Sequence, residues 1–349
     1  MQKKIYSEQE RKYWLKRFSG DFELGDPSSY KKRDLINLMD YTKAELEMFL
    51  EFTERIKSGK DTRPYLANKT VGLMFGVAST RTRISFQVGT RQLGGYADFY
   101  NTNDLQLVYK ESLIDTIRVM SRYIDALVVR MYDMNHYGKG REALDVLSEP
   151  GTIPVINALD DKDHPCQVLG DIFTIKEKFG DDFKKKRVVF TWGYSWRQKS
   201  PGVTHSMLAA SSLLGMNIIF VYPEGFEPDQ EYVNFARETV TQSGGKLEFS
   251  NNLMEACEGA DVIYVKSWKA LNMSSEKDKK IRENIWQDWC VSDEHFKRAN
   301  PGALFMNCLP IIRGEQATAE VIDGKHSIIY DEAENRLHVQ KAIMAGLIR

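Results

Sequence analysis

Residues 71–83 read VGLMFGVASTRTR, and this stretch decides the fold. The apolar run 71–76 has the composition of a strand that is buried on both faces. A short polar loop follows it, and residues 82–93 then carry the apolar spacing of an amphipathic helix. A buried strand that leads directly into a helix is typical of a βαβ unit, so the stretch predicts an α/β protein.

The same alternation of short apolar runs and helix-period segments continues along the chain. Further strands are expected at 125–131, 187–191, 217–222, 261–265 and 303–306, and TIPVINA at 152–158 is strand-like as well. Helices are expected at 112–123, 168–179, 204–214 and 230–243. The pattern predicts parallel sheets with helices on both faces.

The length of 349 residues suggests about two domains. The polar stretch LDDKDH at 159–164 follows a strand-like run, and it places the boundary between a first domain, 1–160, and a second domain, 161–333. A last helix is expected over 334–349, where an apolar stripe that includes Val339, Ile343 and Leu347 would pack back on the first domain.

Composition excludes several classes of function. The 48 basic and 49 acidic residues leave a net charge of −1, which argues against a nucleic-acid or anionic-membrane surface. No run approaches the roughly 18 apolar residues of a membrane helix, and the charged N-terminus lacks a signal-peptide core. Four scattered cysteines without a C-x-x-C pair predict neither a disulfide framework nor a zinc site. We expect a reduced, cytoplasmic protein.

The loop after the strand 71–76 has the features of an anion site. The first N–H groups of a helix lack intrahelical partners, and the helix dipole favours negative charge there. Ser79, Thr80 and Thr82 add hydroxyl donors, and Arg81 adds a guanidinium fork suited to phosphate. The alternative is a plain helix cap with solvated arginines. The stretch is not a P-loop, because it lacks G-x-x-x-x-G-K-[ST].

Other predicted strands also end in polar residues. His164 and Gln167 follow one apolar run, Cys308 follows another, and Arg130 closes the run DALVVR. Ligands of open α/β sheets bind at the carboxyl edge, so these ends indicate a site. Taken alone, each residue also has a purely structural interpretation: His164 as a core histidine, Cys308 as a buried thiol and Arg130 as a surface arginine.

Several of these motifs, in this order, resemble the aspartate/ornithine carbamoyltransferases over nearly the whole chain. They are S-T-R-T-R at 79–83, S-R-Y-x-D-x-x-x-x-R ending at Arg130, H-P-C-Q at 164–167, C-L-P at 308–310 and E-N-R at 334–336. The family binds carbamoyl phosphate, then an amine, and releases phosphate. The resemblance implies carbamoyl transfer to an amino-acid-like amine, most readily ornithine or a derivative, with no metal or cofactor.

The resemblance also assigns the residues. The phosphate would be held by Ser79, Thr80, Arg81 and Thr82. The carbamoyl group would be held by Arg130, His164 and Gln167, by the backbone carbonyls of Cys308 and Leu309, and by Arg336. Fixed donors such as Arg130 and His164 suit a tetrahedral oxyanion, and no protein nucleophile is needed. A reactive thiol at Cys308 is the alternative.

Residues 106–112, QLVYKES, resemble the family loop that enters the active site of a neighbouring subunit. Gln106 and Lys110 fall on its ligand-binding positions, so the resemblance implies a homotrimer with shared active sites. The alternative is a solvated helix entrance capped by Ser112.

The second domain, which would bind the acceptor amine and is called the acceptor half below, is closest in appearance to the N-acetylornithine and N-succinylornithine branch of the family. The S-M-G loop of ornithine enzymes is absent, and Lys266-Ser267-Trp268 matches the branch's K-x-W. Lys266 would pair with a substrate carboxylate, and Trp268 and Trp196 would wall the pocket; a surface lysine and packing tryptophans are the alternatives. The branch also implies a trefoil knot, formed by threading through residues 194–204.

The acceptor half also departs from that branch. Asn307 replaces the usual histidine of H-C-L-P, and it cannot titrate near neutral pH. After C-L-P, the branch usually has two adjacent basic residues and, shortly after them, a lysine. Here Ile312 stands at one basic position and Gln316 at the lysine position, whereas Arg313 keeps the other basic position. The glutamate that precedes H-P-C-Q in the branch is Asp160 here. The carbamoyl phosphate half is intact, and the acceptor half is altered.

Two other functions stay open on the sequence. The same residues would serve an enzyme that splits a ureido compound with phosphate to give carbamoyl phosphate. A different class is a non-catalytic ligand-binding homologue or a dinucleotide-dependent oxidoreductase. The absence of G-x-G-x-x-G after 187–191 weakens the dinucleotide alternative.

Overall fold

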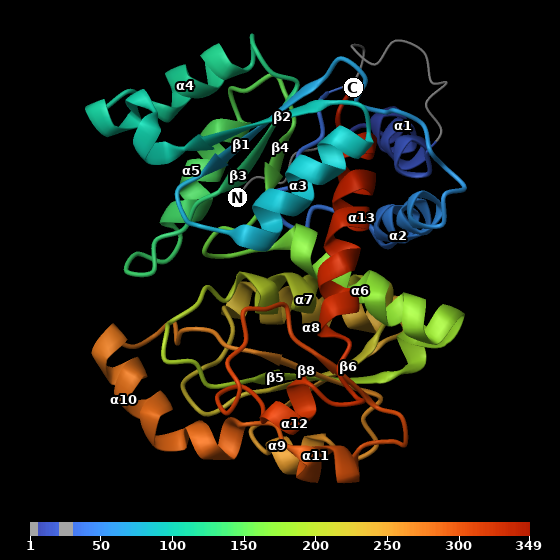
Figure 1. Ribbon diagram of the computed structural model, residues 1–349, viewed down its shortest axis with the longest axis vertical. Coiled ribbons are helices and arrows are strands. Elements are labelled where there is room, and N and C mark those ends of the chain that lie inside the picture. Colours follow the sequence, from blue (N-terminus) through green and yellow to red (C-terminus); the bar gives the residue numbers. More distant parts are fainter. Residues whose placement is uncertain (1–5, 21–30) are drawn as a thin grey trace. The chain divides into compact units, whose positions relative to one another are not determined.

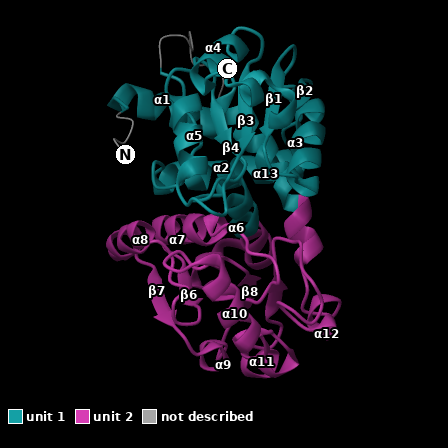
Figure 2. Cartoon of the chain, turned by 90° about the vertical axis from the view of Figure 1, so that its left-hand side faces the viewer, with its two compact units in different colours: residues 1–173, 335–349 teal, residues 174–334 magenta. Residues whose placement is uncertain are grey.

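The computed structural model describes residues 6–20 and 31–349. Contacts divide the chain into two compact units, residues 1–173 with 335–349 and residues 174–334 (Figure 2). Each unit holds one parallel sheet with helices, which confirms the predicted fold class. No helix among the described residues is long and apolar enough to cross a membrane.

The first unit is built on a four-stranded parallel sheet with the order β2-β1-β3-β4 (Figure 1). Its strands are β1 (Thr70–Phe75), β2 (Tyr96–Asn101), β3 (Ala126–Arg130) and β4 (Val155–Asn157). Its helices are α1 (Glu8–Phe18), α2 (Lys43–Lys57), α3 (Thr80–Gln92), α4 (Leu113–Met120) and α5 (Lys139–Ser148), with the short 3-10 turns η2 (Thr102–Asp104) and η3 (Gln106–Tyr109).

Both faces of this sheet are covered. On one face, Met74, Leu127 and Val129 pack with Ile117 of α4 and Leu144 of α5 in a buried cluster. Helix α3 and the C-terminal helix α13 (Ile329–Leu347) lie on the other side (Figure 1). Alternate residues of each central strand therefore meet helices on opposite faces, which explains their uninterrupted apolar sequences.

The second unit has a five-stranded parallel sheet with the order β7-β6-β5-β8-β9. Its strands are β5 (Arg187–Trp192), β6 (Asn217–Val221), β7 (Lys246–Ser250), β8 (Val262–Lys266) and β9 (Leu304–Met306). Its helical segments are η4 (Gly180–Lys185), α7 (Gly202–Leu214), α8 (Gln230–Ser243), α9 (Leu253–Ala256), α10 (Ser275–Ile285), η5 (Trp286–Trp289), α11 (Asp293–Arg298) and α12 (Ala319–Ile322).

Aromatic rings fill the centre of the second unit. Phe190 lies 4.9 Å from Tyr264, 5.1 Å from Phe220 and 6.1 Å from Trp268, measured between ring centroids. Such pairs add specific geometry to the burial of apolar area. The aromatic side chains of β5, β6 and β8 therefore hold the three central strands in register.

The unit boundaries differ from those expected. The first unit extends through Phe173, past the expected end at 160, because the segment between β4 and α6 (Pro165–Phe179) is bonded into it. Asn157 Nδ2 donates to the carbonyl of Ile36 at 2.8 Å, and Arg141 binds two aspartates of this segment. The last helix begins at Ile329, five residues before its expected start, and residues 335–349 belong to the first unit.

Candidate functional site

The first unit presents the loop between β1 and α3 at the carboxyl edge of its sheet. Ser79 is the N-cap of α3 in extended conformation, but its side chain makes no capping hydrogen bond. The first turn carries no acidic residue. Neither a side-chain cap by Ser79 nor an acidic residue of the first turn therefore neutralises this helix start, which favours an anion.

Arg130 lies beside this loop because β1 and β3 are neighbours. Phe75 pairs with Arg130 in the parallel register, and the N–H of Gly76 donates to the Arg130 carbonyl at 2.9 Å. The side chain donates from Nη1 to the carbonyl of Ala158 at 3.2 Å. Its Nε atom is buried with no hydrogen-bond partner among the described residues. The order of the strands across the sheet reverses between β1 and β3, and open α/β sheets bind ligands at such a reversal.

Arg336 joins three distant parts of the chain. Its Nη2 donates to the hydroxyl of Thr82 at 2.7 Å, and its Nη1 donates to the Oε1 of Gln167. Gln167 is held in turn by a 2.7 Å bond from its Nε2 to Asp171. Thr82, Gln167 and Arg336 are all buried. The structure therefore brings together one residue each of S-T-R-T-R, H-P-C-Q and E-N-R.

The positive charges of this edge act on one another. Burial, together with the charges of Arg336 and Arg81, lowers the pKa of Arg130 to about 10. Cations that crowd in this way oppose folding of the empty protein. A bound dianion would relieve the repulsion, so the cluster of Arg81, Arg130 and Arg336 has the electrostatics of a phosphate site.

His164 immediately precedes α6 and is 4% exposed. Its carbonyl accepts hydrogen bonds from the N–H groups of Gln167 and Val168 at 3.1 and 3.2 Å, so it begins the helix. Pro165 occupies the first helical position, where a missing N–H costs nothing. The backbone of His164 is therefore fixed at the end of the segment that leaves β4, and its side chain is buried there.

Asp160 is fully buried and bonded within the first unit. Its Oδ2 accepts from Arg141 Nε at 2.6 Å, and its Oδ1 accepts from the N–H of Lys162 at 2.7 Å. Arg141 also donates to Asp163 at 2.7 Å. These bonds favour a structural role, because they fasten the segment that carries His164. A contact of Asp160 with an acceptor would have to replace these bonds. The sequence did not single out Arg141 or Asp163; an arginine followed at a distance by D-D-x-D was the available signal.

Gln106 and Lys110 lie apart from this cluster. Both are exposed, on or just after η3, and Lys110 ends the turn in the left-handed region with φ of 71°. No residue of the described cluster bonds to them. Within one chain the structure leaves them on the surface.

In the second unit, Lys266 ends β8 opposite Trp192 of β5. It is 6% exposed, and its Nζ donates to the carbonyl of Ser267. Trp268 is fully buried, and its indole N–H donates to the carbonyl of Phe226 at 2.9 Å. Trp268 is therefore a core residue of this unit, whereas Trp196 is 60% exposed.

Asn307 organises the turn after β9. Its Nδ2 donates to the carbonyl of Val265 at 2.8 Å, and its Oδ1 accepts from the N–H of Leu309 at 2.7 Å. Leu309 has a φ of 55° and a cis peptide bond to Pro310, and Cys308 is half-buried as a free thiol. A fixed donor and a fixed acceptor are both needed in this arrangement, which an asparagine side chain supplies without titrating.

The altered residues after this turn are engaged within the second unit. Arg313 donates to both oxygens of Asp323, at 2.7 and 2.5 Å, and the pair is exposed. Gln316 is fully buried and accepts from the N–H of Ile312 at 3.0 Å. Gln316 therefore shapes the loop, whereas the side chains of Ile312 and Arg313 are both exposed.

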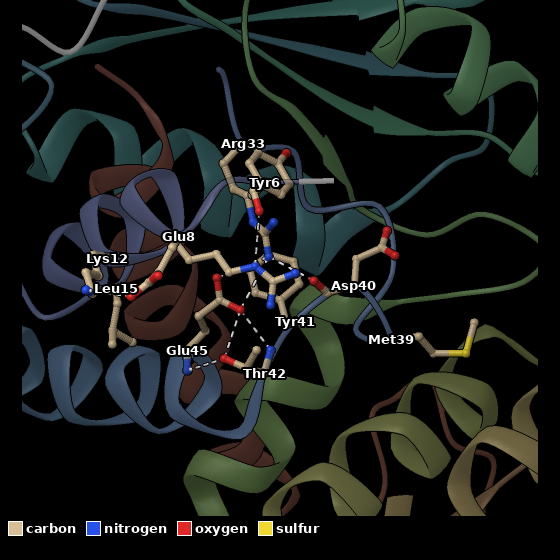
Figure 3. Close-up of a pocket in the computed structure, with 11 residues that line it drawn as sticks. Tyr6, Glu8, Lys12, Leu15, Arg33, Met39, Asp40, Tyr41, Thr42 and Glu45 are labelled. Atoms are coloured by element: carbon tan, nitrogen blue, oxygen red, sulfur yellow. Dashed lines mark hydrogen bonds and ion pairs between the residues drawn. The ribbon is translucent and has the colours of Figure 1, made fainter. Parts of the chain in front are cut away.

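A cavity of about 420 Å³ opens between α1 and residues 33–45 of the first unit (Figure 3). Arg33 lies 4.3 Å from the ring centre of Tyr6 and 4.4 Å from that of Tyr41. The same guanidinium pairs with Glu45 at 3.1 Å and donates to the carbonyl of Asp40 at 2.9 Å. Glu45 thus already neutralises Arg33, and the guanidinium stacks on two tyrosine rings. The residues around this cavity therefore have a structural role.

Sequence models of a protein family match both halves of the chain. The "Aspartate/ornithine carbamoyltransferase, carbamoyl-P binding domain" matches residues 33–177, and the "Asp/Orn binding domain" matches residues 184–347. The chain belongs to the aspartate/ornithine carbamoyltransferase family. The match confirms the resemblance seen in its motifs, and the protein is a carbamoyltransferase.

Individual relatives fall into two groups within this family. The ornithine carbamoyltransferase of Halalkalibacterium halodurans is 41% identical over 92% of this chain and 96% of its own length. The ornithine carbamoyltransferase structure from Pyrococcus furiosus is 38% identical with a TM-score of 0.81, covering 91% of this chain and 97% of that one. An acetylornithine transcarbamylase structure in complex with acetylcitrulline is 34% identical with a TM-score of 0.85, covering 91% and 99%.

Proposed function

We propose that this carbamoyltransferase moves the carbamoyl group of carbamoyl phosphate to the amine of ornithine or an ornithine derivative and releases phosphate. The observation that supports it most is the crowding of Arg81, Arg130 and Arg336 beside the uncapped start of α3. A dianionic substrate neutralises this cluster. Thr82 and Gln167 both bond to Arg336, which supports their assignment to the same ligand.

The reaction needs a neutral amine, which attacks the carbonyl carbon of carbamoyl phosphate. A C–N bond forms, negative charge collects on the carbonyl oxygen, and the C–O bond to phosphate then breaks. Arg130 and His164 are proposed to donate to the oxyanion, because donors fixed in advance stabilise the charge that develops. The phosphate leaves toward Ser79, Thr80, Arg81 and Thr82, and it takes the proton that the amine loses.

The remaining contacts that we propose are with the amide end of the carbamoyl group. Gln167 and Arg336 would bind it from the first unit, and the carbonyls of Cys308 and Leu309 would accept from its N–H groups. The turn at Leu309 supports this role, since the bond from the Leu309 N–H to Asn307 fixes the backbone that carries these carbonyls. Cys308 then acts through its backbone, and no covalent step at its thiol is proposed.

The acceptor is proposed to carry a carboxylate that pairs with Lys266. The K-x-W resemblance favours an acylated ornithine, whereas the relative from H. halodurans, which is more similar in sequence, is named an ornithine enzyme. Arg313 is the second cation proposed for this end, because its partner Asp323 is an exposed carboxylate that a substrate can replace. Trp196 is the aromatic side chain available on the loop after β5.

We also propose a homotrimer with shared active sites. Gln106 and Lys110 are exposed, so they are available to a neighbouring subunit. Large apolar side chains are exposed on the same part of the first unit, and they are Val108, Tyr109, Ile114, Val119 and Tyr123. A surface of this kind is typical of a subunit interface. The four free thiols fit the proposed cytoplasmic location. The knot near residues 194–204 stays a prediction.

A ureido-product assay tests the function. Carbamoyl phosphate is offered with ornithine, N-acetylornithine, N-succinylornithine, putrescine, lysine and aspartate, and product and phosphate are both measured. One or more ornithine-type amines should give equal amounts of the two. Turnover of aspartate or putrescine alone would overturn the proposed acceptor class. Phosphorolysis of the ureido product, followed in the same assay, decides whether the catabolic direction is the faster one.

A further inference from the structure

Helix α10 is buried through a charged pair instead of an apolar face. Its sequence, SEKDKKIRENI, is almost wholly polar, and its buried residues are Asp278 and Arg282. Both side chains are 0% exposed, with 2.6 Å between Arg282 Nη2 and Asp278 Oδ1. Apolar residues in place of a buried ion pair often leave stability unchanged or raise it. Stability alone therefore does not account for this pair.

The pair bonds to the loop that follows β5. Asp278 Oδ1 accepts from Gln198 Nε2 at 3.0 Å, and Arg282 Nη1 donates to the carbonyl of Ser195 at 2.9 Å. One bond therefore reaches a side chain of the loop, and the other reaches its backbone.

The same pair bonds to the loop that follows β8. Asp278 Oδ2 accepts from the N–H of Ala270 at 2.7 Å, and Arg282 Nη2 donates to the carbonyl of Trp268 at 3.4 Å. Each of the two loops therefore receives one bond from the carboxylate and one from the guanidinium. The two loops also meet directly, where the N–H of Lys269 donates to the carbonyl of Lys199 at 2.9 Å.

These two loops form the ligand edge of the second sheet. β5 and β8 are neighbours at the point where the strand order reverses, and ligands of open α/β sheets bind there. Lys266 leads into one loop, and Trp196 is exposed on the other. The separation of the loops therefore sets the geometry in which an acceptor meets its recognition groups.

We propose that Asp278 and Arg282 are positioning residues for the acceptor: the buried pair fixes the two loops at one separation before the acceptor binds. The inference rests on the proposed function, because it takes the acceptor to bind at this edge. A site held in its bound form avoids the free energy of ordering loops during binding. Neither residue contacts substrate in this account, so the pair acts on acceptor affinity through the loops.

The first test is Arg282→Lys, which keeps the charge and removes the guanidinium fork. The guanidinium carbon lies 5.7 Å from the ring centre of Trp192 and 5.8 Å from that of Phe226, a geometry that favours a planar cation. Loss of charge-assisted bonds to both loops should raise the acceptor KM about ten-fold or more. The affinity for carbamoyl phosphate, measured by calorimetry, should not change, because its proposed residues are mainly in the first unit.

The second test separates positioning from stability. The double variant Asp278→Leu with Arg282→Met replaces the pair by apolar groups, and it should melt close to the parent while losing the loop bonds. It should show the same rise in acceptor KM. Trypsin should also cut it faster after Arg197, Lys199 and Lys269, which lie on the two loops. The matched control is Lys279→Ala with Glu283→Ala, an exposed i,i+4 pair on the same helix, which should change none of these readouts.

Each outcome decides the inference. A parent-like acceptor KM and parent-like trypsin resistance in both variants would overturn it. Loss of the folded state in both variants, Arg282→Lys included, would also overturn it, since the pair would then determine folding. If the parent enzyme itself turns over no amine, the proposed function fails, and the trypsin comparison still reports separately on the loops.

Discussion

The two units place polar side chains at the same kind of sheet edge, but the surroundings of Arg130 in the first unit differ from those of Arg282 and Arg313 in the second. In the first unit, burial and the charges of Arg336 and Arg81 disfavour the cationic form of Arg130. In the second unit, Arg282 is paired with Asp278 and Arg313 with Asp323. Arg130 thus lies near other cations at its edge, whereas Arg282 and Arg313 each lie against a carboxylate. This difference agrees with the family models, which match the first unit to a carbamoyl-P binding domain and the second unit to an Asp/Orn binding domain.

The largest effect should follow from Arg130→Met. Removal of one preorganised donor to a developing oxyanion lowers kcat by about 10²–10³-fold. The ligand-free variant should nevertheless melt within about 4 °C of the parent or higher, because the substitution also removes a crowded cation. Product formation and thermal melting, measured on the same sample, check both parts. A normal kcat, or a large loss of stability, would contradict the contrast between the units.

A second way to sharpen the comparison is Lys266→Met, which removes the proposed partner of the acceptor carboxylate. The acceptor KM should rise about ten-fold, and the affinity for carbamoyl phosphate should stay the same. Initial rates at saturating carbamoyl phosphate give the KM. An unchanged acceptor KM would leave Lys266 as a structural residue at the end of β8.

The third prediction concerns the ligand itself. Carbamoyl phosphate at about 100 times its Kd should raise the free energy of unfolding by about 2.7 kcal/mol, whereas the acceptor alone should raise it little. Thermal melts with each ligand separately give the answer. Equal stabilisation by the acceptor alone would contradict the proposal that the first unit binds carbamoyl phosphate and that the acceptor alone binds little.

The smallest effect is a pH dependence away from the ligand edge. Burial raises the pKa of Asp145 to about 6, with a further contribution from Asp160, above its ordinary value of 3.8. The raised value means that ionisation opposes folding, so parent stability falls relative to Asp145→Asn as the pH rises from about 4 to 6. Above pH 6 the difference in stability between the parent and Asp145→Asn is constant. Melting of both proteins from pH 4 to 8 checks this, and a difference independent of pH would contradict it.

The central strands of both units could be predicted from the sequence. Strands such as β1 and β8 are buried on both faces, so their apolar runs stand out. The edge strands β2 and β7 were missed, because exposed and half-buried residues alternate along them and no continuous apolar run exists. Thr82, Gln167 and Arg336 were predicted through motifs, although local pattern could not show that they bond to one another across more than 160 residues.

The acceptor half was less predictable for a physical reason. Trp268 and Asp160 belong to sequence patterns that suggest contact with a ligand, but both are fully buried and bonded within their own units. Asp278 and Arg282 look like an ordinary surface pair at i,i+4 on a polar helix. Burial decides the role of such residues, and burial depends on contacts between segments that are distant in sequence.

The most direct test of the account is the binding of carbamoyl phosphate to Arg81→Ala, measured by calorimetry. Arg91→Ala is the matched control, because Arg91 is exposed in the last turn of the same helix, α3. Arg81→Ala should stay folded and lose detectable binding, while Arg91→Ala should bind like the parent. Parent-like binding by Arg81→Ala would contradict the assignment of the anion site to the first unit.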